Sequence, residues 1–385
     1  MNRKLLAASV AALFATGAAQ AEIAVSANDN KAYLDNGVSK VVANPPPDTV
    51  TVIDLSSRPP KVRAEIPVPT SLVGPPQSVA VTADESLAFV TAAQRIDPFD
   101  PTKSIAYNRL TMIDLKDNPP AILDTVEAGA GASGVTVNRQ GTMVLVANRN
   151  EGTVSAFRLE GRKLASLGKV SLGDAKSGPS AVVFTPDGKR ALVTRDGDHT
   201  LSILAIDGDK VTDTKRDFGS GYRPYGADIT PDGKYAVVAN IGRNVGDVDT
   251  MSLVDLAATP PRTVDLVAVG HTPEGIILSP DGKTVAVVTH NGSAKPKNSP
   301  LYNPQGKVVL YRLDNGKFSR LAEAPIGVWS QGAAFSKDGK TLLVQNLVER
   351  EIQVFSFDGT TLKDTGQRLK TKGGPAAIRT AVPRP

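Results

Sequence analysis

The stretch GPSAVVFTPDGK, which begins at Gly178, decides the fold, because related stretches recur along the whole chain. Each copy contains a small residue, a run of alternating apolar residues and a tight turn, in most copies built on Asp-Gly. The other copies are PPQSVAVTADES from Pro75, GASGVTVNRQG from Gly131, RPYGADITPDGK from Arg223, TPEGIILSPDGK from Thr272, WSQGAAFSKDGK from Trp329 and GPAAIRTAVPRP from Gly374. They lie roughly 50 residues apart, a period typical of β-propeller blades rather than of helical solenoids.

The residues between these copies predict the remaining strands of each blade. An Asp-Gly-Lys turn, read as a two-residue hairpin, leads into a second strand such as ALVTR from Ala191 or AVVAN from Ala236. A third alternating run follows, as in TLSILAI from Thr200, and a weaker fourth strand completes the unit. Third strands and first strands both occur seven times but out of phase along the chain. The sequence therefore predicts an all-β, seven-bladed propeller of four-stranded antiparallel blades.

The two chain ends are expected to share one blade. Along the chain, one run of the third-strand type comes before any first strand. The final run, which begins at Gly374, is of the first-strand type. We expect this C-terminal strand to pair with N-terminal strands at residues 31–34, 49–55 and 62–68, because closure of the ring leaves no open sheet edge.

The first 21 residues have the pattern of an export signal. A basic start at Arg3 and Lys4 precedes a short apolar stretch and the small-residue site Ala-Gln-Ala, with cleavage expected after Ala21. We therefore expect residues 1–21 to be a signal peptide, residues 22–385 to be one propeller, and the location to be the periplasm or the cell exterior. No later segment is apolar enough to span a membrane.

Composition excludes several classes of chemistry. The chain of 385 residues has no Cys, three His and one Trp. The absence of Cys removes disulfides, thiol nucleophiles and thiolate-bound metals. The net charge of +5 comes without any long Lys or Arg run, which does not support nucleic-acid binding. Neither a Gly-x-Ser-x-Gly elbow nor a phosphate-binding loop is present. We expect no cofactor, no metal and a monomer.

Three strand ends carry a family resemblance. LVANRN from Leu145, VVANIG from Val237 and LVQNLV from Leu343 each follow a predicted turn and resemble the YVTN repeat. Proteins with this repeat are seven-bladed propellers related to lactonase-type propellers. The resemblance covers nearly the whole chain after the leader. It implies the fold, whereas related propellers include lactonases, muconate-cycloisomerising enzymes, heavy subunits of amine dehydrogenases and proteins without known activity.

The predicted topology indicates which face carries the site. Connections between blades and the loops between second and third strands lie on one face, which we call the loop face. The other face carries the short turns within blades, and we call it the turn face. Long loops are expected at residues 36–48, 93–109, 241–249 and 290–306, and insertions on one face of a ring are typical of a binding face. Neutral loop growth is the alternative.

The candidate site lies where the first strands begin on the loop face. There the sequence gathers a carboxylate, an arginine, an aromatic residue and two histidines over three consecutive blades, an asymmetry that indicates a site. The candidate catalytic residues are Glu274, His271 and Arg223. The candidate ligand-binding residues are Tyr225, Trp329, Gln331, Arg195, Asn240, His290, Asn346 and Gln77.

Structural roles for the same residues stay open at this point. Glu274 and Arg223 could form a rim ion pair, His271 could only bond a carbonyl, and Trp329 could plug the channel mouth. Aspartates in residues 195–199 and 246–249 lack a full ligand set for Ca²⁺. The sequence favours a non-catalytic propeller that binds a small ligand or a periplasmic protein. The alternative is a lactonase-like hydrolase or isomerase for an anionic or lactone substrate, with Glu274 or His271 as acid/base and Arg223 and Arg195 as anion ligands.

Overall fold

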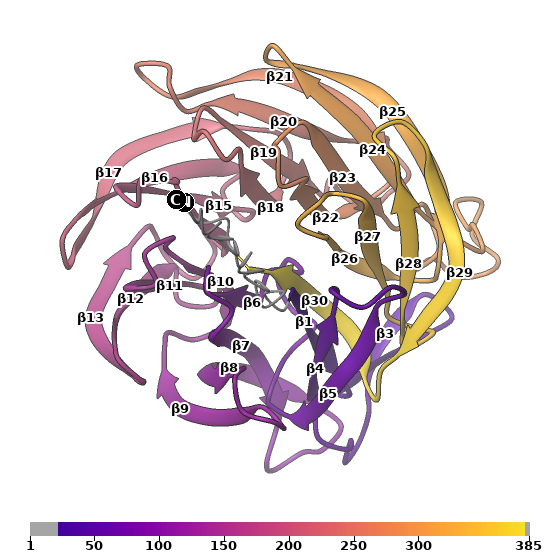
Figure 1. Cartoon of the computed structure of the whole chain (residues 1–385), viewed down its shortest axis with the longest axis horizontal. Helices are drawn as coiled ribbons and strands as arrows, with labels where there is room; N and C mark the ends of the chain where they lie inside the picture. The colour runs from indigo at the N-terminus through magenta and orange to yellow at the C-terminus, as the bar shows by residue number, and fades with distance from the viewer. Residues whose placement is uncertain (1–21, 382–385) are drawn as a thin grey trace, which may run out of the picture.

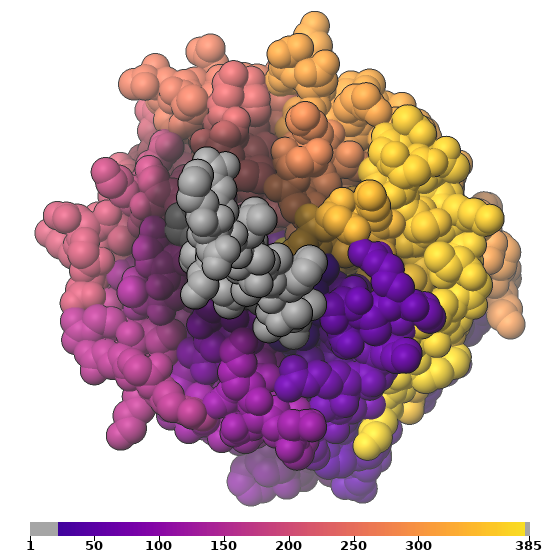
Figure 2. Space-filling model, viewed as in Figure 1, coloured from indigo at the N-terminus to yellow at the C-terminus, as the bar shows by residue number. Residues whose placement is uncertain are grey.

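The computed structural model describes residues 22–381, which form a ring of seven four-stranded antiparallel sheets (Figure 1). The predicted signal peptide and its cleavage site lie outside the described residues. The blades follow one another around a central channel, and the space-filling view has a round outline in which indigo meets yellow (Figure 2). No helix among residues 22–381 has the length and hydropathy that crossing a bilayer requires.

Each blade runs from an inner strand at the channel to an outer strand at the rim (Figure 1). The inner strands are β30 (Gly374–Thr380), β6 (Val79–Val81), β10 (Ala132–Val137), β14 (Pro179–Phe184), β18 (Pro224–Ile229), β22 (Pro273–Leu278) and β26 (Ser330–Phe335). The second strands are β1 (Ile23–Asp29), β7 (Leu87–Ile96), β11 (Met143–Asn148), β15 (Arg190–Arg195), β19 (Tyr235–Asn240), β23 (Thr284–Thr289) and β27 (Thr341–Asn346). The third strands are β4 (Thr49–Asp54), β8 (Ser104–Asp114), β12 (Thr153–Glu160), β16 (Thr200–Asp207), β20 (Asp249–Asp255), β24 (Gly306–Asp314) and β28 (Glu351–Phe357). The outer strands are β5 (Lys61–Pro67), β9 (Ala121–Glu127), β13 (Lys163–Ser171), β17 (Lys210–Gly219), β21 (Arg262–Gly270), β25 (Lys317–Ile326) and β29 (Leu362–Lys370).

The first blade closes the ring as expected, but its second strand differs from the prediction. β30 pairs with β1, where Ala27 lies opposite Ala377, and β1 pairs with β4. The expectation that residues 31–34 supply this strand is wrong. All seven residues of β1 are buried, as a strand with neighbours on both edges and packed blades on both faces requires. Residues 32–35 instead form β2 (Ala32–Asp35), which pairs with β3 (Val38–Val41) in a separate, partly exposed hairpin.

The Asp-Gly-Lys turns are longer than a two-residue hairpin. In the fourth blade the strands end at Phe184 and resume at Arg190. Asp187 Oδ1 accepts hydrogen bonds from Thr185 Oγ1 at 2.6 Å and from Lys189 N at 3.0 Å, and Gly188 has a φ of 70°. The predicted two-residue length is therefore wrong, because the Asp side chain organises a wider loop that still needs glycine for its positive φ.

The hydrophobic core is divided among the interfaces between blades. One cluster joins the first two blades through Val25, Val52 and Val79, and another joins the sixth and seventh through Val288 and Phe335. Comparable clusters lie at the other interfaces. The inner and second strands are buried on both faces, which explains their nearly continuous apolar sequence. This packing makes a rigid frame for the side chains at the mouth of the channel.

Candidate functional site

Bulges in the inner strands form the platform of the site. Pairing to the second strand is interrupted between Pro179 and Val182 in β14 and between Pro224 and Ala227 in β18. Similar interruptions occur in β22 and β26. In these blades the residue directly before the small residue of each repeat, which is Tyr225 in β18, lies inside the interruption. We call these residues the ring positions. Bulges redirect side chains at barrel and propeller rims, so the repeat itself positions this ring.

Backbone strain accumulates two residues before the ring. At this repeat position φ is 72° at Gly131 and 59° at Gly178, which is inexpensive for glycine. The next three blades place Arg223 (φ 59°), Thr272 (φ 53°) and Trp329 (φ 54°) in the same left-handed conformation. Such side chains in this region cost of order 1–2 kcal/mol each. The strained residues fall in the same three-blade sector that the sequence predicts as the site.

Two arginines share one buried aspartate at the edge of this sector. Asp196 is 2% exposed and lies 2.6 Å from Arg149 Nη1 and 2.9 Å from Arg223 Nη2. Its Oδ1 also accepts a hydrogen bond from Ser180 Oγ at 2.9 Å. Burial tends to raise the pKa of Asp196, but the bonds from Arg149, Arg223 and Ser180 hold this pKa below its usual value. Asp196 is therefore an anion that fixes two guanidinium groups.

Glu274 is held close to these arginines without pairing with them. Among the described residues, its carboxylate pairs with no Lys or Arg, and it lies 3.6 Å from Nε2 of His290. Its side chain is 13% exposed, and burial raises its pKa from 4.5 to about 7, opposed by the charges of Arg223 and Arg149 and assisted by Asp196. The alternative of a Glu274–Arg223 rim ion pair is wrong, because Arg223 pairs with Asp196 instead. Glu274 is thus poised to gain or lose a proton near neutral pH.

Both histidines of this sector are neutral, and His290 lies beside Glu274. Burial lowers the pKa of His290 to about 3, with further contributions from His271 and Lys295. Burial also lowers the pKa of His271, and Lys295 adds to this effect. The Nε2 atoms of both rings are buried and make no hydrogen bond with any described residue. The neutral ring nitrogen of His290 can therefore accept a hydrogen bond from the protonated form of Glu274.

Tyr225 and Trp329 complete the sector. Tyr225 is buried, and the Arg149 guanidinium lies 5.5 Å from the centre of its ring. Burial next to Glu274 raises the pKa of Tyr225, which keeps the phenol neutral. Trp329 is partly buried, and its backbone N–H donates to Ser293 Oγ at 3.1 Å. Gln331 is 1% exposed and its Nε2 bonds the carbonyl of Trp329, while its Oε1 has no hydrogen-bond partner among the described residues.

Gln77 crosses the channel below this cluster. Its Nε2 donates to the carbonyl of Ala227 at 2.5 Å, and its Oε1 accepts the Ala227 N–H at 3.2 Å. Gln77 enters from the second blade and Ala227 belongs to the fifth. This bridge separates the loop-face cluster from the lower part of the channel. The structure therefore shows Gln77 as the floor of the site.

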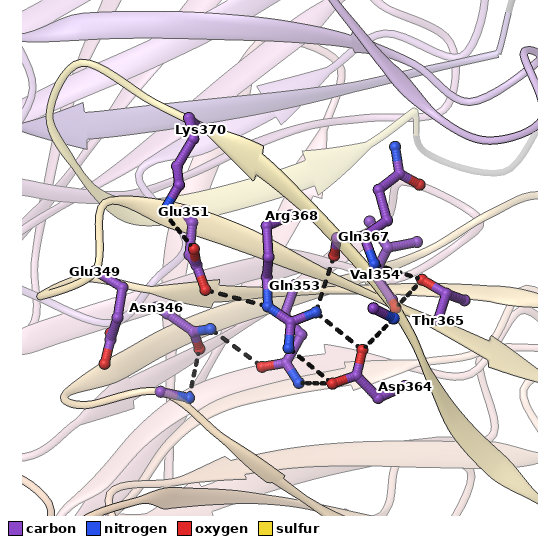
Figure 3. A network of polar contacts seen from close by, with 12 residues as sticks. Asn346, Glu349, Glu351, Gln353, Val354, Asp364, Thr365, Gln367, Arg368 and Lys370 are labelled. Carbon is purple, nitrogen blue, oxygen red and sulfur yellow. Dashed lines mark hydrogen bonds and ion pairs between the residues drawn. The ribbon is translucent and has the colours of Figure 1, made fainter.

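The structure directs three other predicted ligand residues away from the cluster and into their own blades. Asn240 Nδ2 bonds Thr250 and Ser252, and Arg195 pairs with Asp198 and with Asp217. Asn346 bonds Gln353, which connects to the polar network of Asp364 and Arg368 on the outer strand and Glu351 on the third strand (Figure 3). Successive strand residues face opposite sides, so these final residues of the second strands brace the third strands rather than reach Glu274.

In three blades the residue directly after the second strand belongs to the functional cluster instead. This position is occupied by Arg149, Asp196 and His290 in three blades, and by Ile241 and Leu347 in two others. Sequence reasoning overlooked Arg149 and considered Asp196 only as part of a calcium loop. The available signal was a repeat position that is apolar in some blades and ionisable in others.

The long loops cover the site together. Residues 290–305 follow β23, and Lys295 Nζ donates to the Asn244 carbonyl in the loop at residues 241–248. On the other side, Lys297 N donates to Asn36 Oδ1 of the β2–β3 hairpin at 3.0 Å. Residues 93–96 and 104–109, expected as loop, extend β7 and β8. The expected insertions thus lie on the loop face, where three of them contact one another.

Metal binding receives no support from the described residues. No group of three or more His, Asp or Glu residues within residues 22–381 is placed to hold a metal ion. Asp249, from one of the acidic loops, accepts the N–H of Thr272 at 2.8 Å. That loop aspartate therefore orients the connection that carries His271.

With the geometry established, comparisons with known proteins define the class. The family model "Lactonase, 7-bladed beta-propeller" matches residues 102–221. The predicted resemblance to lactonase-type seven-bladed propellers is therefore confirmed. No curated protein matches the chain.

Solved structures agree on the fold over nearly the whole chain. A candidate 6-phosphogluconolactonase of Bacteroides fragilis has a TM-score of 0.72 at 16% identity, covering 95% of this chain and 99% of that one. The periplasmic gluconolactonase of Pseudomonas aeruginosa has a TM-score of 0.67 at 15% identity, covering 94% and 99%. Kuenenia stuttgartiensis hydrazine synthase has a TM-score of 0.63 at 21% identity, covering 81% and 91%. These identities establish likeness of fold. Of the two functions that the sequence left open, the family match favours the hydrolase.

Proposed function

We propose that this propeller hydrolyses a small lactone that carries an anionic group, with the reaction at Glu274. The observation that carries the proposal is the buried carboxylate itself, whose pKa is raised to about 7 beside two guanidinium groups. A carboxylate with this pKa is half ionised at neutral pH, the condition under which general base catalysis is most effective. The family match at residues 102–221 supports a lactone as the substrate class.

The residues suit the steps of ring opening. Ionised Glu274 removes a proton from water as the water oxygen bonds to the lactone carbonyl carbon. The resulting oxyanion would be stabilised by a guanidinium group of Arg149 or Arg223. The bond from this carbon to the ring oxygen then breaks, and protonated Glu274 returns its proton to that oxygen. His290 is a positioning residue: its pKa of about 3 keeps it neutral, so its Nε2, 3.6 Å from Glu274, can orient the protonated carboxyl group without taking its proton.

The exposed part of Arg223 favours an anionic substrate. Arg149 and Arg223 bring two permanent positive charges, which Asp196 and ionised Glu274 together balance, so an anionic group would be bound by direct contact with a guanidinium group. Arg223 keeps 34% of its side chain exposed at the entrance, where it can contact a phosphate or carboxylate. We therefore expect a sugar lactone phosphate to be a better substrate than the corresponding neutral lactone. The predicted leader would place this reaction outside the cytoplasm.

The test is hydrolysis of glucono-1,5-lactone and its 6-phosphate, followed by acid release against the uncatalysed background. We expect wild-type activity with the phosphate ester and a loss of about 100-fold or more in Glu274→Gln. Glu160→Gln is the matched control, because Glu160 is exposed on a turn-face hairpin. Equal activity of Glu274→Gln and wild type, or hydrolysis at the background rate for both lactones, would contradict the proposal and favour a purely binding role.

A further inference from the structure

A cavity separate from the candidate site occupies the lower part of the channel, on the turn-face side of Gln77. Its volume is about 440 Å³, within the range of small-molecule sites. The walls are mainly apolar and come from the inner strands of several blades, including Val79, Val135, Val182, Ile277 and Phe335. The Gln77–Ala227 bridge described above separates this cavity from Glu274. The proposed hydrolysis makes no use of it.

Three charged residues line this apolar cavity: Lys337 pairs with Glu85, whereas two residues of opposite charge are unpaired within the described part of the chain. Asp228 lies in β18 and Arg379 in β30, strands of different blades. Among residues 22–381 neither has an oppositely charged group within the 4 Å of an ion pair. Asp228 receives backbone N–H bonds from Ile229 and Leu278, both at 2.9 Å. With the residues that the structure describes, the Arg379 guanidinium makes a single hydrogen bond, at 3.5 Å, to the carbonyl of Ile378.

Burial in the cavity disfavours both charges. It raises the pKa of Asp228 and lowers the pKa of Arg379, and each group partly offsets this effect on the other. A guanidinium with most of its N–H donors unused matches the geometry of a carboxylate. A carboxylate that can still accept hydrogen bonds suits an ammonium group. A ligand that supplies both groups satisfies the two charges together.

We propose that the lower channel binds a small zwitterion with an apolar side chain, of the α-amino acid class. Its ammonium group lies at Asp228, its carboxylate at Arg379, and its side chain against the valine-rich wall. The proposal is independent of lactone hydrolysis, because the site lies on the other side of Gln77.

Isothermal titration of the protein with L-leucine and L-phenylalanine tests this site. We expect at least one of them to bind, and we expect 4-methylpentanoate and 3-methylbutylamine, each with one charge, to bind at least about tenfold more weakly than leucine. Arg379→Gln and Asp228→Asn should each weaken binding by a similar factor. The double variant leaves no lone buried charge, so it should fold even where a single variant does not, and it should not bind.

The matched controls are Arg312→Gln and Asp314→Asn, since both residues are exposed on the β24–β25 hairpin outside the channel. They should bind the amino acid as wild type does. Absence of binding to both amino acids, equal affinity for the one-charge analogues, or undiminished binding by the double variant would overturn the proposal. Binding is measured without lactone, so failure of either proposal leaves the other standing.

Discussion

Replacement of Glu274 by glutamine separates a catalytic carboxylate from a structural one. Glutamine keeps the size of the side chain but cannot ionise. Burial raises the pKa of Glu274 from 4.5 to about 7, so its ionised form is disfavoured in the folded state. A group of this kind lowers folding stability as pH rises from 4.5 to 7, because the folded state then binds more protons than the unfolded state. At 1.36 kcal/mol per unit, the loss at pH 8 is about 3 kcal/mol.

The glutamine variant avoids this loss. We expect wild type and Glu274→Gln to differ by about 1 kcal/mol or less in free energy of unfolding at pH 5. At pH 8 the variant should be more stable by about 3 kcal/mol, while its lactone hydrolysis falls by about 100-fold. His290 has the opposite pH dependence: burial lowers its pKa to about 3, so its contribution is lost as pH falls below 6.5. Since both proteins contain His290, its contribution cancels in the comparison.

Urea unfolding followed by circular dichroism at pH 5 and pH 8 measures the difference directly. The activity of the same two preparations is measured across the same pH range, where wild-type rates should rise towards a plateau above pH 7. A variant that is less stable than wild type at pH 8 would refute the reasoning. That result would mean that the Glu274 carboxylate is stabilised by the arginines and serves the fold.

Three further changes test the frame around the site. Arg223→Gly and Arg223→Ala both lose the ion pair with Asp196, but only glycine relieves the left-handed φ, so Arg223→Gly should be about 1 kcal/mol more stable than Arg223→Ala in thermal unfolding, and both should weaken apparent affinity for the anionic substrate; equal stability of the two variants would contradict this. Asp196→Asn should cost about 3 kcal/mol in urea unfolding and raise KM, because two partly buried guanidinium groups lose their shared anion; an unchanged midpoint would count against that role. Gly275→Ala should unfold at much lower temperature than wild type, because a Cβ there would lie 2.4 Å from the Gln331 carbonyl oxygen. Gly226→Ala should be tolerated, because the nearest atom to a Cβ at that position lies at 3.4 Å. Similar losses of stability in both variants would show that lack of space is not the cause.

The architecture follows from the sequence because the repeat is strong at every level. Alternating apolar residues and Asp-Gly turns predict strands and their order, and the phase difference between strand types predicts that the ends share a blade. The assignment of residues 31–34 to that blade failed for a local reason. The strand at residues 23–29 follows directly on the predicted leader, so its regular pattern was overlooked in favour of the next alternating segment.

The candidate site was predictable in location but not in detail. The sequence places Glu274, Arg223, His290 and Tyr225 in one sector, and the structure brings these four residues together around Arg149 and Asp196. Sequence spacing cannot decide which of several nearby carboxylates an arginine selects. The pairing of Arg223 with Asp196 rather than with Glu274 depends on side-chain geometry across neighbouring blades. Because Arg223 pairs with Asp196, Glu274 has no arginine partner and is available for the proton transfer proposed for it.

Closure of the ring by β1 and β30 has a consequence for how the protein reaches its native state. Ala27 pairs with Ala377, so this contact must join positions about 350 residues apart, and such distant pairings slow folding. Six blades can form from local hairpins as the chain emerges, whereas the seventh has to wait for the last strand to be synthesised. Until then the edge of β1 remains open to pairing with other chains, and the face of the β26 blade that packs against β30 remains exposed. Folding yield and resistance to aggregation therefore both depend on the pairing of the final strand with β1.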